Sequence, residues 1–530
     1  MASACPAALD TAPCYTAGLV TPPAFSTVSP ATRLAGRAPR LGILMVASEV
    51  APWAKTGGLA DVLSSLPEAL DHLGHRVTIV LPRYRGVVVP TGQAIARTVA
   101  VGTSVHQVWC HVSQLSDRRR VVFVDAPELF DRDGYYTIRG QDFPDNAERF
   151  AVLSTAALDL AEATFAAEPI DIVHAHDWQA GLVPVLLRSQ PRRWPSLARA
   201  GAVLTIHNLL FQGLFPREVV PTLGLGWEWF AVDRGEFWGR FSFLKAGITA
   251  SDYVTTVSPA YARETLRPEF GYGFEGVLAS RGDRYAGILN GIDTRTWDPA
   301  SDEWLPARYD AARLAGKAPC KRALLEQYRL PVGDDALRRP LVGMVSRLVR
   351  QKGLDLVEAA SAVLVGLDAT WVFLGSGEPR YEQLLRGLAE RHPARVGVRI
   401  GFDEPLAHLV EAGADMFLMP SIFEPCGLNQ MYSLRYGTVP VVHGVGGLDD
   451  TIRPYTARAR HANGFKFREA TGEALVKTMR QAVRLYENRP VWESLMRQGM
   501  TEDHSWETSA KEYVKVYRRA RHDAHSLGAA

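Results

Sequence analysis

The chain has few cysteines for its 530 residues, and none of them forms a Cys-x-x-Cys pair. An odd number of scattered cysteines argues against a disulfide framework and against a zinc ribbon. The same pattern favours a reducing compartment. The five are Cys5, Cys14, Cys110, Cys320 and Cys426.

The chain also lacks a charge imbalance and a long apolar run. Lys and Arg total 59 and Asp and Glu total 57, so the formal net charge is only +2. A nearly neutral chain gives no reason to expect a nucleic-acid partner. No stretch reaches the roughly 18 apolar residues that would predict a membrane-spanning helix. We therefore expect neither nucleic acid nor a membrane as partner.

Residues 1–40 differ from the rest of the chain. They are rich in Ala, Pro, Ser and Thr, with Arg33, Arg37 and Arg40 and a single acid, Asp10. This composition is typical of a transit peptide, and equally of a disordered leader or a misassigned start codon. A secretory signal is not expected, because no compact apolar core region is present.

From residue 41 onward, apolar runs alternate with helical patterns. A length of 530 residues predicts two or three domains of about 100–200 residues each. Near-continuous apolar strands between helices predict a parallel α/β sheet covered on both faces. The expected strands of the first such domain lie within 42–50, 75–84, 119–127, 171–178 and 200–208.

The alternation is interrupted near residues 297–339 and then starts again. That interval is rich in Pro, Asp and Arg, and predicts a connector with one helix near 320–330. A second α/β domain follows, with expected strands within 339–348, 369–377, 395–402, 415–421 and 438–444. The expected divisions are 1–40 (leader), 41–300 (N-terminal domain), 301–339 (connector), 340–500 (C-terminal domain) and 501–530 (final helix and tail).

Ligands of open α/β sheets bind at the carboxyl ends of the strands. After the first strand stand Lys55, Thr56, Gly57 and Gly58, followed by a helix. Glycines allow close backbone approach, and a helix N-terminus favours an anion. The alternative is a tight turn with a solvated lysine.

Three further polar sites follow strands of the first domain. His174, His176 and Asp177 favour a polar strand end over a metal site, because no third ligand stands nearby. His207 by itself is typical of a turn histidine, and Asn290 precedes glycine in a strong turn signal.

The second domain places two cations, Arg347 and Lys352, just after its first strand. This pattern suits a diphosphate, with a solvated loop as the alternative. Gly375 lies in a short glycine-rich turn that is a weak signal by itself. Glu424 precedes Cys426, Gly427 and an expected helix. Because a glycine and a helix N-terminus suit a phosphate, a carboxylate there needs a separate role, such as binding sugar hydroxyls.

Seven motifs in this order resemble glycosyltransferase family 5, which contains bacterial glycogen synthases and plant starch synthases. The resemblance extends from about residue 41 to 520. The motifs are KTGGL (55–59), DNAERF (145–150), HAHDWQAGL (174–182), HNLLFQG (207–213), NGID (290–293), SRLVRQKGLDL (346–356) and EPCGLNQMYSLRYGTVPVV (424–442).

The resemblance implies an α/β GT-B fold, with two Rossmann-like domains facing an interdomain cleft and a C-terminal helix that crosses back. The N-terminal domain would hold the acceptor and the C-terminal domain the nucleotide sugar. The implied reaction transfers glucose from ADP-glucose to the non-reducing end of an α-1,4-glucan, with retention of configuration. It implies no cofactor and no metal, so we expect the acidic pair at 131–133 to be a solvated loop.

The resemblance also assigns roles to residues. Arg347 and Lys352 neutralise the diphosphate, and Glu424 binds the donor sugar and stabilises the transition state. His207 contacts the transferred glucose near its 6-hydroxyl, and Asp177 holds the sugar or orients its neighbours. The remaining substrate-binding candidates are Lys55, Gly57, Gly58, Asp61, Asn290, Gly375, Cys426, Gly427 and Leu428.

Several alternatives stay open. A cytoplasmic bacterial glycogen synthase competes with a plastid starch synthase, for which residues 1–40 would be the transit peptide. A retaining glucosyltransferase with a small acceptor is a further reading. A catalytically silent glucan-binding scaffold is disfavoured, because Lys55, Arg347, Lys352 and Glu424 are all present.

Overall fold

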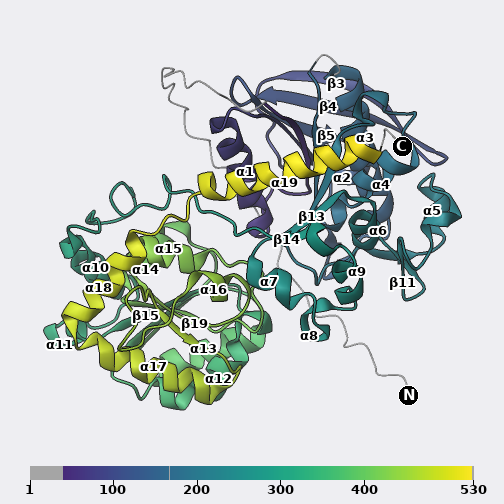
Figure 1. The fold of residues 1–530 in the computed structure, drawn as a ribbon. Helices are drawn as coiled ribbons and strands as arrows, with labels where there is room; N and C mark the ends of the chain where they lie inside the picture. Colours follow the sequence, from purple (N-terminus) through teal and green to yellow (C-terminus); the bar gives the residue numbers. More distant parts are fainter. Residues whose placement is uncertain (1–39, 166–167, 528–530) are drawn as a thin grey trace, which may run out of the picture. The chain divides into compact units, whose positions relative to one another are not determined.

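The structure of the chain is a computed structural model that describes residues 40–165 and 168–527. The expected leader therefore lies outside the described residues, apart from Arg40. The chain forms two compact units (Figure 1). Unit 1 contains the described residues up to 255, together with 270–286 and 510–527, and unit 2 contains 256–269 and 287–509. Within the described residues, no helix has the length and apolar character needed to cross a membrane.

Unit 1 is built on a nine-stranded sheet in the order β14-β13-β9-β8-β1-β2-β5-β4-β3. The pairs linking β9, β8, β1, β2 and β5 are parallel, which confirms the expected parallel core. The strands are β1 (Gly42–Val46), β2 (Arg76–Pro82), β3 (Gln93–Val101), β4 (Ser104–Gln114), β5 (Arg119–Asp125), β8 (Ile172–His176), β9 (Gly201–Ile206), β13 (Tyr253–Thr256) and β14 (Tyr285–Gly287).

The expectation of an all-parallel sheet is wrong at one edge. Strands β3 and β4 form an antiparallel hairpin, and β4 also pairs antiparallel with β5. The hairpin turns at Gly102, whose φ of 55° lies in the left-handed region that favours glycine. Residues of β3 are mostly exposed on alternate positions, because antiparallel strands at an edge can have one face in water.

Helices of unit 1 cover this sheet, and α19 returns the chain to it. The hydroxyl of Tyr517 lies 2.9 Å from Nδ1 of His174, and Arg519 pairs with Asp283 at 2.6 Å. This return confirms the expected crossing helix, drawn in yellow in Figure 1. The helices are α1 (Gly58–His72), α2 (Pro127–Phe130), α3 (Asn146–Thr164), α4 (Leu182–Ser189), α5 (Val219–Thr222), α6 (Phe243–Ala250), α8 (Pro268–Gly271, at the boundary of the units), α9 (Glu275–Ala279) and α19 (Trp506–Leu527).

A small antiparallel sheet also belongs to unit 1. Its strands are β10 (Leu214–Pro216), β12 (Arg240–Ser242) and β11 (Glu236–Phe237), in that spatial order. A second short pair joins β6 (Thr137–Ile138) to β7 (Gln141–Asp142).

Unit 2 contains a six-stranded parallel sheet in the order β17-β16-β15-β18-β19-β20. Alternate residues of β15 enter different apolar clusters: Val342 and Met344 belong to one, and Leu341 to the other. Both faces are therefore covered, as the continuous apolar runs predict. The strands are β15 (Leu341–Val345), β16 (Thr370–Gly375), β17 (Val396–Ile400), β18 (Met416–Met419), β19 (Val439–His443) and β20 (Phe465–Phe467).

The segment at 301–339 is packed into unit 2 through a buried ion pair. Nζ of Lys321 lies 2.6 Å from Oδ2 of Asp415, which also accepts the backbone N–H of Leu341 at 2.9 Å. The helix expected there is α10, and a short second helix, α11, follows it. The helices of unit 2 are α7 (Pro259–Glu264), α10 (Lys317–Gln327), α11 (Asp334–Arg338), α12 (Leu354–Leu364), α13 (Pro379–Arg391), α14 (Glu404–Gly413), α15 (Asn429–Arg435), α16 (Gly446–Thr451), α17 (Gly472–Tyr486) and α18 (Arg489–Met500).

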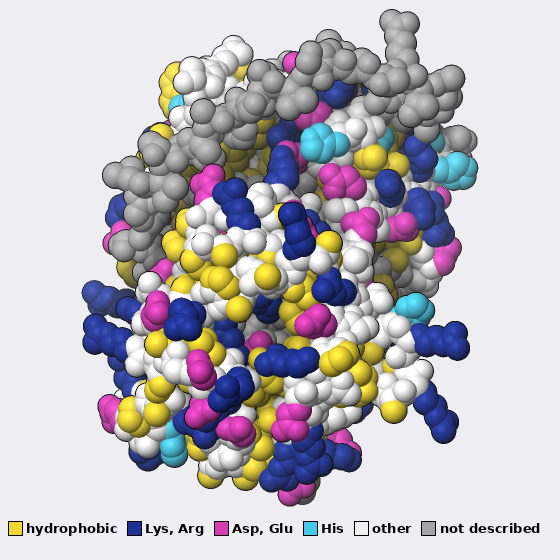
Figure 2. Space-filling model, turned by 90° about the vertical axis from the view of Figure 1, so that its left-hand side faces the viewer, with side chains coloured by type: hydrophobic (Ala, Val, Ile, Leu, Met, Phe, Trp, Pro, Cys, Tyr) yellow, Lys and Arg dark blue, Asp and Glu magenta, His cyan; other side chains and the backbone are white. Residues whose placement is uncertain are grey.

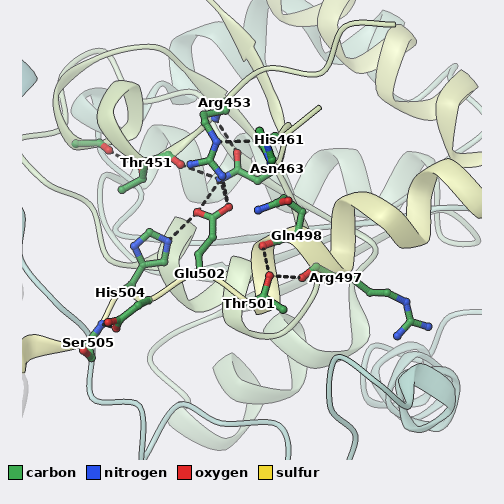
Figure 3. A network of polar contacts seen from close by, with 12 residues as sticks. Thr451, Arg453, His461, Asn463, Arg497, Gln498, Thr501, Glu502, His504 and Ser505 are labelled. Atoms are coloured by element: carbon green, nitrogen blue, oxygen red, sulfur yellow. Dashed lines mark hydrogen bonds and ion pairs between the residues drawn. The ribbon is translucent and has the colours of Figure 1, made fainter. Parts of the chain in front are cut away.

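A polar network fixes the chain between α18 and α19 (Figure 3). Glu502 forms an ion pair with Arg453, accepts hydrogen bonds of 3.1 Å from Asn463, and lies 3.3 Å from Nε2 of His504. Burial acts to raise the pKa of Glu502, but the His504 and Arg453 contacts hold it below its usual value. The segment between α18 and α19 is thereby anchored to unit 2.

Charge on the surface is mixed in sign. On the face shown in Figure 2, Lys and Arg side chains are interspersed with Asp and Glu side chains. This distribution agrees with the nearly balanced composition. The three cysteines among the described residues, Cys110, Cys320 and Cys426, are free and buried.

Candidate active site

In unit 1, the candidate residues follow three neighbouring strands of the sheet. Strands β9, β8 and β1 are adjacent and parallel, so their carboxyl ends share one edge. The loop with Lys55 follows β1, Asp177 follows β8 and His207 follows β9. The parallel register therefore brings the expected residues of this unit to a common edge.

The loop between β1 and α1 is held by a buried carboxylate that sequence analysis missed. Glu49 accepts the backbone N–H of Thr56 at 2.5 Å, its hydroxyl at 2.6 Å, and the Tyr136 hydroxyl at 2.5 Å. Burial nevertheless raises the pKa of Glu49, since desolvation outweighs these bonds. The only signal in the sequence is one acid within an otherwise apolar run.

The two glycines of this loop are not required by packing. A Cβ built on Gly57 or on Gly58 meets no atom within 4 Å. Their small size therefore leaves open space at the start of α1, as a closely approaching ligand needs. The side chain of Lys55, in the same loop, is half-exposed. Its Nζ pairs with Oδ1 of Asp61 at 2.7 Å.

Asp177 and His207 are joined directly. Oδ1 of Asp177 accepts the backbone N–H of His207 at 2.7 Å. Burial raises the pKa of Asp177 to about 7, against the lowering effect of that bond. Asp177 also has a φ of 55°, an uncommon conformation for a residue other than glycine. The structure thus brings together two residues that the sequence places thirty positions apart.

His207 is also the end of a buried chain of three histidines, with His176 and His174. Nδ1 of His176 lies 3.0 Å from Nε2 of His207, and the rings of His174 and His176 are 4.0 Å apart. Burial lowers the pKa of His174 and of His207 to about 3, and that of His176 well below its usual value. The His176–His207 contact is therefore a hydrogen bond between neutral rings, which sequence analysis did not anticipate.

Neither suspected metal motif gathers a ligand set. Asp131 and Asp133 both pair with Arg85, at 2.7 and 2.8 Å, and both are exposed. Within residues 40–165 and 168–527, no group of three His, Cys, Asp or Glu residues could hold a metal ion.

In unit 2, the candidate residues again follow adjacent parallel strands, β16, β15 and β18. Arg347 follows β15 and is exposed, with its guanidinium 3.4 Å from Oε1 of Gln351. Gly353 ends the same loop with a φ of 76°, and a Cβ there would lie 2.0 Å from the carbonyl oxygen of Pro420. This glycine is therefore required for the loops after β15 and β18 to touch.

That close approach brings Lys352 and Glu424 into an ion pair. Nζ of Lys352 lies 2.6 Å from Oε2 of Glu424, and the two side chains are 19% and 8% exposed. The Ser421 hydroxyl donates to the same oxygen at 2.9 Å. The family resemblance implies separate roles for the lysine and the glutamate, whereas in the structure each compensates the charge of the other.

The remaining candidates of unit 2 differ in what the structure shows of them. A Cβ on Gly375 would lie 1.8 Å from the carbonyl oxygen of Ser346, so this glycine is needed for packing. Burial raises the pKa of Cys426 to about 12, and the backbone amide of Asn290 bonds to its thiol. Gly427 has a φ of 73°, and Leu428 directly precedes α15.

Among the buried polar atoms of this unit that have no partner within the described part of the chain, two belong to residues near the candidate site. They are Oδ1 of Asn290 and the Ser346 hydroxyl. Buried acceptors and donors are normally satisfied, so unpaired ones point to a missing ligand or water. Ser346 directly precedes the candidate Arg347 in the loop after β15, and Asn290 is itself a candidate.

Two Rossmann-like units with cations after β15 and a compensated carboxylate after β18 define a glycosyltransferase of the GT-B class. The sequence matches the starch synthase catalytic domain over residues 42–280, and the glycosyl transferases group 1 family over 334–497. The chain belongs to the family of glycogen synthases and starch synthases, glycosyltransferase family 5.

Individual relatives cover nearly the whole chain. The glycogen synthase of Anaeromyxobacter dehalogenans (strain 2CP-C) is 52% identical over 479 residues, 90% of this chain and 99% of the relative. That of Koribacter versatilis is 45% identical over 481 residues, 90% of this chain and 98% of the relative. Among solved structures, the chain is similar to the catalytic domain of starch synthase IV from Arabidopsis thaliana, bound to ADP and acarbose. The TM-score is 0.82 and the sequence identity 32%, over 91% of this chain and 100% of that domain.

The histidine chain predicts a pH dependence of stability. A pKa of about 3 in the folded state lies below the unfolded value of about 6.5, so the unfolded state takes up a proton first. The contribution of His174 to stability is therefore full above pH 6.5 and is lost as pH falls towards 3. Between pH 7 and pH 5, the free energy of unfolding therefore falls by about 2 kcal/mol through this one histidine.

His174→Gln removes this term while keeping an amide that can bond to Thr205 or Tyr517. We expect urea unfolding midpoints of the variant to fall less between pH 7 and pH 5 than those of the unaltered protein. The exposed His525→Gln is the matched control and should leave the pH dependence unchanged. Equal pH dependence in the His174 variant and the unaltered protein would contradict the account.

Proposed function

We propose that the protein elongates an α-1,4-glucan of the glycogen type by transferring glucose from ADP-glucose to its non-reducing end, with retention of configuration. The observation that carries this proposal is the Lys352–Glu424 ion pair beside Arg347 at the carboxyl edge of the unit 2 sheet. The curated relatives named above are glycogen synthases, and the starch synthase IV structure contains ADP.

The two cations of unit 2 stabilise the leaving group. The C1–O bond to the diphosphate breaks, and negative charge grows on the ADP oxygens. Arg347 binds two of these oxygens with its planar fork, and Lys352 adds a point charge. Groups positioned before the reaction and aimed at developing charge give the largest catalytic effect.

Glu424 acts on the sugar side of the same bond. When a diphosphate draws Lys352 towards itself, Oε2 of Glu424 becomes free to accept hydrogen bonds from the donor glucose. Its negative charge also stabilises the positive charge that develops at C1. The acceptor 4-hydroxyl attacks C1 from the face that the diphosphate leaves, and its proton passes to the departing phosphate oxygen. This route needs no covalent nucleophile.

In this proposal, the candidate residues of unit 1 also bind the reactants. Lys55 lies beside the open space at Gly57 and Gly58 and contributes charge for the nucleotide sugar. Asp177 fixes the backbone at His207, whose backbone carbonyl faces the 6-hydroxyl of the transferred glucose in this proposal. Asp61 completes the candidates of unit 1. In unit 2, the unpaired Oδ1 of Asn290 is available for a sugar hydroxyl that donates a hydrogen bond.

The same proposal covers location and partners. Bacterial glycogen synthases are the named curated relatives, which favours a cytoplasmic bacterial enzyme over the plastid alternative. The partners are the nucleotide sugar and the glucan, and the balanced charge gives no support for nucleic acid.

The central test is glucose incorporation into glycogen from ADP-glucose and, separately, from UDP-glucose. We expect incorporation with a preference for ADP-glucose. Glu424→Gln should lower kcat by about 100- to 1000-fold, because the isosteric amide cannot stabilise positive charge. The matched control is Glu404→Gln, an exposed carboxylate of α14, which should leave kcat unchanged.

Each failure of this test has a distinct meaning. A preference for UDP-glucose would contradict the donor assignment and leave the chemistry intact. Transfer to maltose but not to glycogen would favour the small-acceptor alternative. Full activity in Glu424→Gln would remove this residue from the mechanism.

We also propose that no metal takes part, because Lys55, Arg347 and Lys352 supply the positive charge that a metal would otherwise provide. Incorporation from ADP-glucose should therefore be the same in excess EDTA as in buffer with added Mg²⁺. A loss of more than about tenfold in EDTA, restored by Mg²⁺ or Mn²⁺, would contradict this proposal.

A further inference from the structure

The hairpin of β11 and β12 has an unusual residue at its turn. Phe237 pairs with Arg240, which leaves a two-residue turn of Trp238 and Gly239. Their φ angles are 52° and 76°, the left-handed pair of a type I′ turn. The first position of such a turn favours Asn, Asp or Gly, and tryptophan there is strained.

This strain is not offset by burial. Trp238 is 82% exposed, the largest exposed fraction among the exposed large apolar residues described. Trp227 and Val232, on the segment that leads into the hairpin, are also exposed. A strained residue held at the surface is an observation that points to function rather than to stability.

The hairpin beneath the ring is firmly held. The backbone N–H of Gly239 donates to Oε1 of Glu236 at 2.7 Å. Nζ of Lys245 donates to the carbonyl oxygens of Val232 and Glu236 at 2.7 and 2.6 Å. Phe237 packs on Phe274 with ring centroids 4.6 Å apart.

The backbone of Gly273 lies close to one edge of the indole. A Cβ built on Gly273 would lie 3.4 Å from Nε1 of Trp238 and 2.9 Å from the ring of Phe237. The ring therefore rests on the backbone at one edge and stays open elsewhere. The backbone of the turn is held before any partner arrives, which lowers the entropy lost on binding.

We propose that Trp238 is a docking platform for the glucan acceptor, where its ring stacks on the apolar face of a glucose unit. A protein interface needs a broad apolar core, whereas the hairpin strands that flank this turn carry the polar residues Glu236 and Arg240. One flat ring among polar groups matches a pyranose, which has an apolar face and a rim of hydroxyls. The identity of the sugar polymer rests on the proposed function.

The test removes the ring without straining the turn. Trp238→Asn puts a residue that favours the left-handed conformation at this position, so the fold is retained. Trp238→Phe keeps an aromatic ring. The control is Trp109→Thr, which removes an exposed tryptophan from β4 at an ordinary strand position.

Binding is measured by retardation in native gels that contain glycogen, a readout that does not need catalysis. We expect Trp238→Asn to weaken binding by about 5- to 10-fold, and Trp238→Phe and Trp109→Thr to stay within about twofold. In the transfer assay, KM for glycogen should rise by a similar factor in Trp238→Asn. Its kcat and its KM for maltotriose should not change.

Three results would overturn the platform. They are unchanged glycogen binding in Trp238→Asn, an equal loss in Trp109→Thr, and a changed sedimentation coefficient in Trp238→Asn, which would indicate a face between copies of the chain. A failure of the proposed function would give a different result from a failure of this proposal. In that case the unaltered protein would bind glycogen through Trp238 but transfer no glucose.

Discussion

The 2.6 Å ion pair between Lys352 and Glu424 is the contact on which the rest of the site depends. A carboxylate that is only 8% exposed is costly unless a cation compensates it. The pair is possible because Gly353 lets the loop after β15 touch the loop after β18. Packing of two backbone segments thus fixes the distance between two opposite charges. Without Lys352, the buried charge of Glu424 would destabilise the unit and would repel a diphosphate.

Unit 1 also contains a buried carboxylate beside its candidate residues, but no cation among the described residues compensates it. There the buried carboxylate of Glu49 is satisfied by backbone amides and hydroxyls, and it holds the loop of Lys55 in place. The lysine itself stays half-exposed beside Asp61. In both units, apolar parallel strands form the rigid part, and polar residues begin where each strand ends. The chemistry therefore lies on short loops whose positions the sheet determines.

The sequence predicts the strands with continuous apolar runs, such as β1, β9 and β15, because they are buried on both faces. It fails at β3 and β4, whose alternating pattern belongs to an exposed antiparallel edge. For the site, motif order predicts which residues matter, and the structure pairs Asp177 with His207 and Lys352 with Glu424. Such pairs depend on sheet order, which no local pattern contains. Glu49 and Trp238 were missed because neither stands in a recognisable motif.

The most direct measurement of the central claim is the affinity for ADP, by calorimetry, of the unaltered protein and of Glu424→Gln. If Lys352 must leave Glu424 to bind the diphosphate, removing the carboxylate charge should tighten ADP binding by about fivefold or more, although the variant turns over poorly. Glu404→Gln should bind ADP as the unaltered protein does. Equal or weaker ADP binding by Glu424→Gln would contradict the account, because Lys352 would then not exchange one partner for the other.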